Sequence, residues 1–150
     1  MLMKSLKELI NAILNSSENK ELENIKRNPT MIKEITNPTE AQQLAAVRSS
    51  SHVIKYIKEP TKKVRFIALK DDIYNYRYIK SLTKKEQLYL IKEGIRIENI
   101  KRPVEKVQLY ALKWRRASIN DIKNPTEKAQ LITCLLYTSP SPRDKRHLVC

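Results

Sequence analysis

The sequence repeats itself at a nearly constant interval from residue 32 to residue 133, and this repetition constrains the fold more than any other feature. Equivalent rows begin at Ile32, Ile54, Tyr76, Ile97 and Ile119, with steps of 22, 22, 21 and 22 residues. Each row carries two apolar residues three apart, a polar turn and a longer apolar stripe. A unit of this size cannot bury its apolar residues alone, so neighbouring units are expected to stack.

Each row is predicted to form two short helices. The longer one begins at motifs such as Asn37-Pro38-Thr39-Glu40, where Asn or Thr is able to cap the first turn and the choice stays open. In the third row, Thr83 and Glu86 have the spacing of a capping box. Leu44 and Val47 begin a packing stripe that continues in later rows, and Phe66 and Leu69 hold the same positions in the second.

We therefore predict an all-α fold, an α-solenoid of about five 22-residue two-helix repeats with an N-terminal amphipathic capping helix. A strand interpretation is disfavoured because the apolar residues recur every three positions and the chain has one glycine. The handedness of the array is left open.

These rows resemble HEAT-like short helical repeats, and more closely the uncharacterised phage and bacterial arrays built from Asn-Pro-Ser/Thr-Glu-x-x-Gln-Leu-x-Ala-Val/Leu. The motif is complete from Asn37 to Val47 and weaker at 60–69, 103–112 and 125–132. Leu82 replaces proline in the third row, where the turn is expected to differ. The resemblance implies an interaction scaffold, and it brings no catalytic residues.

Residues 1–31 are predicted to form a helical cap over the first repeat. Leu2, Leu6, Leu9, Ile13 and their apolar neighbours share one helical face. The alternative is a helix that binds a membrane surface or serves as a targeting signal. The apolar runs are too short and interrupted for a membrane span or a signal peptide.

The C-terminal segment 134–150 is predicted to be non-native. Residues 134–144 resemble, residue by residue, the translation of a transposase sequencing adapter. The repeat array 32–133 is then a truncated fragment whose last row stops inside its unit. Without this tail the net charge falls from +14 to +12, no cysteine is left, and His52 is the only histidine.

Basic residues recur at three positions of the repeat, and stacking is expected to turn these positions into columns. Adjacent members would lie about 8–10 Å apart, a spacing suited to phosphates along a nucleic-acid backbone. The alternative is a solvated face. The two columns taken as candidate anion or nucleic-acid contacts are Arg48, Lys70, Lys92 and Lys113, and Lys58, Lys80, Lys101 and Lys123; the third is Lys63, Lys85, Lys106 and Lys128.

Two further sets of side chains have a structural and a functional interpretation. A glutamine column is expected to hydrogen-bond the loop of the adjacent repeat rather than a partner; its members are Gln43, Gln87, Gln108 and Gln130. The aromatic residues near the basic columns are able to stack on bases, although such side chains more often fill gaps in a core; they are Tyr74, Tyr76, Tyr78, Tyr89, Tyr110 and Trp114.

Little in the sequence supports catalysis. One glycine, Gly94, excludes glycine-rich phosphate loops and dinucleotide motifs, and His52 has no partner for metal binding or nucleophilic catalysis. The prediction is a non-enzymatic, cytoplasmic scaffold without cofactors that binds a protein. Nucleic-acid binding through the basic columns is the alternative, and self-association through the uncapped C-terminal repeat is a further expectation.

Overall fold

The computed structural model describes residues 2–137, and every regular element in that range is helical. The prediction of an all-α fold is therefore confirmed. Met1 and residues 138–150 lie outside the described residues, and so does the greater part of the suspected adapter segment. The chain divides into two compact units, residues 1–80 and residues 81–150, and each is described by itself.

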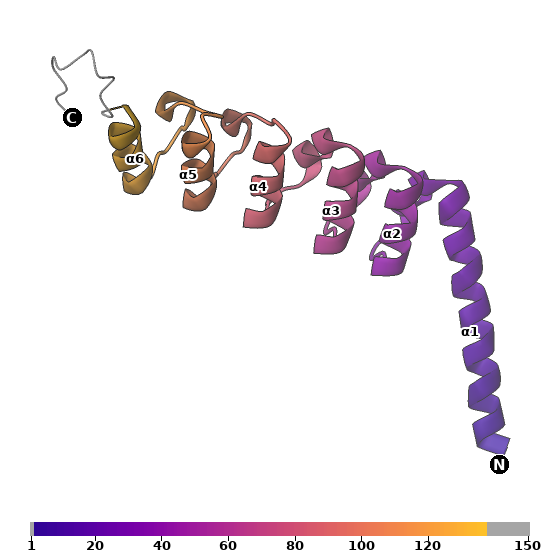
Figure 1. The fold of residues 1–150 in the computed structure, drawn as a ribbon. Helices are drawn as coiled ribbons and strands as arrows, with labels where there is room; N and C mark the ends of the chain where they lie inside the picture. The colour runs from indigo at the N-terminus through magenta and orange to yellow at the C-terminus, as the bar shows by residue number, and fades with distance from the viewer. Residues whose placement is uncertain (1, 138–150) are drawn as a thin grey trace, which may run out of the picture. The chain divides into compact units, whose positions relative to one another are not determined.

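Unit 1 consists of a long helix followed by alternating 3-10 and α-helices. Its elements are α1 (Leu2–Arg27), η1 (Pro29–Glu34), α2 (Glu40–Ser49), η2 (Ser51–Tyr56), α3 (Lys62–Asp71) and η3 (Ile73–Tyr78). Helix α2 packs against α1 and α3, while η1, η2 and η3 contact one another in sequence order (Figure 1). Two layers result, one of α-helices and one of 3-10 helices.

Unit 2 has the same alternation with shorter 3-10 helices. Its elements are α4 (Lys84–Lys92), η4 (Ile97–Asn99), α5 (Glu105–Lys113), η5 (Ile119–Asp121) and α6 (Glu127–Tyr137). Helix α5 packs against both α4 and α6. The predicted pair of short helices is therefore present in each row, with the first member of each pair a 3-10 helix.

Threonine, and not asparagine, caps α2, α3, α4 and α6. The hydroxyls of Thr39, Thr61 and Thr83 accept hydrogen bonds from backbone N–H groups three residues later. The predicted capping box of Thr83 and Glu86 is confirmed. Proline lies before the cap, outside the helix, so it shapes the entering turn instead of occupying the first helical position. Val104 stands at the cap of α5 without a side-chain cap.

The core is formed by one apolar face of each α-helix together with isoleucines of the 3-10 layer. Leu69 and Ile54 are fully buried, as are Leu90 and Val107 in unit 2. The predicted stripe is only half right, because Phe66 is 37% exposed whereas Leu69, three residues on, is inaccessible. The buried face of α3 therefore consists of Val64, Ala68 and Leu69.

The α-helices of the two units end differently. Helices α2 and α3 end at Ser50 and Asp72, both in extended conformation. Helices α4 and α5 end in Schellman motifs whose left-handed residues are Gly94, with φ of 95°, and Arg115, with φ of 51°. The N–H groups of Ile95 and Arg116 then bond carbonyls five residues back.

Helix α1 has two halves with different surroundings. Near its C-terminal end Ile25 is buried, and the Glu21 carboxylate accepts a hydrogen bond of 3.1 Å from the Gln42 side chain of α2. In the first half, the apolar residues of the predicted amphipathic face are 47–62% exposed; these are Leu6, Leu9, Ile10, Ile13 and Leu14. Among the side chains of α1 that the structure describes, which leave out Leu2 of the predicted face, apolar burial against the rest of unit 1 occurs in the second half.

Candidate functional site

The structure places the two candidate columns at opposite ends of the α-helices. Arg48 and Lys70 lie in the last turns of α2 and α3, and Lys92 and Lys113 in the last turns of α4 and α5. We call these four residues the C-terminal edge. The N-terminal edge precedes the capping residues by three positions, in the loops entering the α-helices; it comprises Lys58, Lys80, Lys101 and Lys123. A helix of nine or ten residues separates the edges by about 14 Å.

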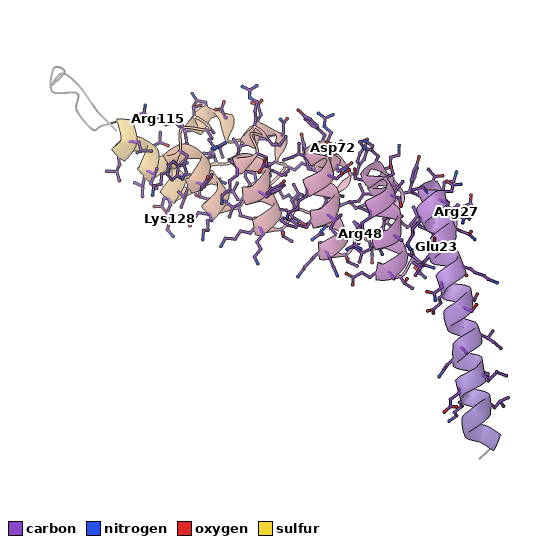
Figure 2. All side chains as sticks on the ribbon, turned by 45° about the vertical axis from the view of Figure 1, so that its right-hand side comes forward. Glu23, Arg27, Arg48, Asp72, Arg115 and Lys128 are labelled. Carbon is purple, nitrogen blue, oxygen red and sulfur yellow. The ribbon has the colours of Figure 1, made fainter. Side chains whose placement is uncertain are left out.

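All four side chains of the C-terminal edge are exposed. Within residues 2–137 none of them has a carboxylate within ion-pair distance. Asp71 and Glu93 are the residues directly after Lys70 and Lys92, and neither forms an ion pair with its neighbour. Figure 2 labels Arg48, which lies in the last turn of α2. Cations in the last turn offset the negative end of the helix macrodipole, so part of their role is structural.

The N-terminal edge carries mixed charge. Its four lysines are exposed, as are the lysines of the third column in the first turns of α3 to α6. Acidic side chains begin several of the same helices, and one of them pairs: Lys128 Nζ, in α6 (labelled in Figure 2), lies 3.2 Å from Glu105 Oε1. The Glu40 carboxylate accepts a hydrogen bond from the Thr61 hydroxyl. Anions therefore meet competing carboxylates at this edge.

The glutamine column links successive repeats, as expected. Gln43 donates to the Pro38 carbonyl of its own loop and accepts from the Thr61 N–H of the next. Gln108 donates to the Pro103 and Asn124 carbonyls and accepts from the Thr126 N–H, and Gln87 repeats this pattern. Gln130 in α6 keeps only the bond to its own loop, at 3.5 Å. The three buried amides, those of Gln43, Gln87 and Gln108, are structural.

Aromatic rings adjoin the C-terminal edge. Lys70 Nζ lies 5.1 Å from the Phe66 ring centre in unit 1. In unit 2, Lys92 lies 5.7 Å from the Tyr110 ring and Lys113 lies 5.9 Å from the Trp114 ring. Three of the four edge cations thus stand beside an aromatic ring, an arrangement that the repeat spacing alone does not reveal.

Arg116 is a residue that the sequence reasoning missed. Its guanidinium donates hydrogen bonds of 3.1 Å to the carbonyls of Ile91 and Lys92, at the end of the preceding α-helix. Both carbonyls lie in the last turn, where no N–H four residues on is available, and the Ile91 carbonyl also accepts from the Gly94 N–H. No other row has an arginine at this position, so the repeat pattern carries no signal for it.

Resolved pKa shifts arise from local contacts. The backbone N–H of Ser118 holds the pKa of Asp121 below its usual value, because the bond favours the carboxylate. A hydrogen bond with Tyr76 raises the pKa of Arg77, whose guanidinium also faces the Tyr74 ring at 5.4 Å.

The described residues give no sign of a catalytic or metal centre. His52 Nδ1 lies 3.7 Å from the Asp72 carboxylate, but the imidazole is 64% exposed and the aspartate caps η3. Within residues 2–137 no group of three or more potential ligands is placed to hold a metal. A hollow of about 500 Å³ beside Lys58 is lined by residues of both charge signs, among them Lys33, Glu34 and Glu59.

The comparisons add no relative from which a function could be transferred. No protein-family model, no curated protein and no solved structure matches the chain. Among the described residues, none of the helices combines the length and apolar character needed to cross a bilayer.

Proposed function

We propose that the chain is an α-solenoid of HEAT-like repeats that acts as a cytoplasmic, non-enzymatic scaffold and binds a protein carrying an acidic surface. The observation that carries this proposal is the C-terminal edge. Its four exposed cations recur at the same helical position and have no carboxylate partner within residues 2–137. In each unit, a pair of cations at the same position of successive α-helices suits a partner with repeated carboxylates.

The repeat-to-repeat hydrogen bonds support the solenoid part of the proposal. Gln87 and Gln108 bond the next loop through both donor and acceptor, and Gln43 bonds it through its acceptor alone, so these glutamines set the register of the following repeat. Interactions of this kind between adjacent repeats give successive repeats the same relative orientation, so that equivalent residues lie on one surface.

Nucleic-acid binding is the second candidate function. The aromatic rings next to Lys70, Lys92 and Lys113 favour it, because bases stack on such rings. An acidic protein surface would need the cations alone. The abundance of lysine over arginine weighs against bidentate phosphate recognition.

Fluorescence anisotropy with labelled poly-L-glutamate tests the first candidate. Reversing the charges at Arg48, Lys70, Lys92 and Lys113 to glutamate is expected to weaken binding about tenfold or more at about 50 mM salt, because each exposed ion pair contributes roughly 0.2–1 kcal/mol. Affinity should also fall as salt rises.

A matched variant carries the same change in net charge on α1, away from both edges, with glutamate at Lys7, Lys20, Lys26 and Arg27. This control should bind poly-L-glutamate almost as well as the parent. Equal losses of affinity in the two variants would show that bulk charge attracts the ligand, and the assignment to the C-terminal edge would then be wrong. A labelled oligothymidylate run in parallel tests the second candidate.

A further inference from the structure

The half-buried ring of Tyr110 and the exposed ring of Trp114 lie next to each other at the end of α5. Their centroids are 6.2 Å apart and their planes are inclined by 45°. Lys113 Nζ lies over the Trp114 ring, and Lys92 Nζ, from α4, lies over the Tyr110 ring, which leaves the opposite faces of the rings for a ligand. We call these four side chains the Trp114 platform.

Trp114 takes no part in the core of unit 2. Its side chain is 60% exposed, while the buried face of α5 consists of Val107, Gln108, Ala111 and Leu112. Tryptophan has the largest apolar side chain, and a ring left this exposed forgoes most of the stabilisation that burial gives. The packing of α5 therefore does not account for an aromatic residue at this position.

The backbone around the platform is held in place from two sides. Arg115 ends α5 in the left-handed conformation directly after Trp114. Arg116 bonds the last carbonyls of α4, those of Ile91 and Lys92, so the end of α4 is tied to the end of α5. Arg116 thus holds the backbone of Lys92 next to the end of α5.

We propose that the Trp114 platform binds single-stranded nucleic acid, with bases stacked on Trp114 and Tyr110 and phosphates bound by Lys92, Lys113 and the exposed Arg115. This inference rests on the second candidate function and specifies its site. Exposed aromatic faces flanked by cations are what single-strand binding requires. A duplex hides the faces of its bases, and an acidic polypeptide has no flat ring to stack.

Helix polarity opposes the binding of an anion at this position. The end of α5 is the negative end of its macrodipole, which repels phosphate within the last turn. Three cations around the platform, Lys92, Lys113 and Arg115, carry full charges against about half a charge of opposite sign. The local field therefore still favours an anion.

Intrinsic fluorescence gives a direct test, because Trp114 is the only tryptophan in the chain. The full chain is titrated with three probes of similar length: oligothymidylate, an abasic deoxyribose-phosphate oligomer and poly-L-glutamate. Oligothymidylate should quench Trp114 to saturation. The abasic oligomer should bind about fivefold or more weakly, and poly-L-glutamate should leave the emission unquenched.

Substitutions then separate stacking from charge. By anisotropy with labelled oligothymidylate, Trp114→Ala should reduce the affinity about fivefold or more, and Trp114→Phe should recover most of it. Lys92→Gln with Lys113→Gln should reduce the salt slope by about 0.7 for each phosphate that is no longer neutralised, whereas Lys101→Gln with Lys123→Gln should not reduce it. Circular dichroism checks that each variant is folded.

The outcomes distinguish this inference from the broader proposal. An unchanged affinity for oligothymidylate in Trp114→Ala, or equal binding of the abasic oligomer, overturns the platform. Binding of poly-L-glutamate alone, abolished when the charges of the C-terminal edge are reversed, overturns it while supporting the protein-binding function. Failure of all three probes to bind contradicts both.

Discussion

Two left-handed residues, Gly94 and Arg115, end α4 and α5 in equivalent Schellman motifs. Glycine adopts this conformation without steric cost, whereas an L-residue such as arginine is strained there by roughly 1 kcal/mol. A Cβ added at Gly94 would meet no atom within 4 Å, so the cost of a side chain at Gly94 comes from the backbone conformation and not from a steric clash.

Arg115→Gly is therefore expected to raise the free energy of unfolding of unit 2 by about 0.5–1 kcal/mol, and Gly94→Ala to lower it by about 1 kcal/mol. Urea unfolding followed by Trp114 fluorescence measures both changes. Arg96→Gly is the control, because Arg96 has φ of −67° and glycine relieves no strain there. If Arg115→Gly destabilises as much as Arg96→Gly, the left-handed cap at Arg115 is wrong.

At the scale of elements, α1 makes two different contributions to unit 1. Ile25 is 2% exposed, whereas Ile13, more than three turns before it, is 62% exposed. Ile25→Ala should lower the free energy of unfolding of unit 1 by about 2–4 kcal/mol, and Ile13→Ala should change it by no more than about 0.5 kcal/mol. Urea unfolding followed by circular dichroism provides the measurement. Similar destabilisation in both variants would show that the first half of α1 is covered in solution.

The sequence predicted the helical pairs because the apolar spacing recurs in each row and most rows have a threonine able to cap the helix. It did not distinguish Asn from Thr as the cap, since both side chains accept hydrogen bonds from a first turn. Nor did it show that Phe66 lies outside while Leu69 lies inside, because residues three apart share a broad face and neighbouring helices decide which is covered.

The candidate site was harder to predict than the repeats. The periodicity identified both edges and their positions relative to the helices, but not the aromatic rings that adjoin the C-terminal edge. The pairing of Lys92 with Tyr110 joins two different rows, and Arg116 breaks the pattern altogether. Interactions between rows depend on how side chains pack across helices, which the spacing along one row does not encode.

At the scale of the whole molecule, the chain is held together by local interactions. In each unit, the elements that pack closely are neighbours or next neighbours in sequence. An array with such connectivity has stability that is approximately a sum of repeat and nearest-neighbour terms. Unfolding in two steps, one for each unit, is then expected in place of a single cooperative transition.

Two fully buried residues, one in each unit, test this expectation: Ile54 in η2 and Leu90 in α4. Ile54→Ala should destabilise unit 1 by about 2–5 kcal/mol and shift the dichroism transition, while Trp114 fluorescence, which reports unit 2, keeps its midpoint. Leu90→Ala should shift the fluorescence midpoint to lower urea. Because each variant serves as the control for the other, an equal shift of both signals in Ile54→Ala would contradict independent units and show that a defect in the first repeats reaches the Trp114 platform.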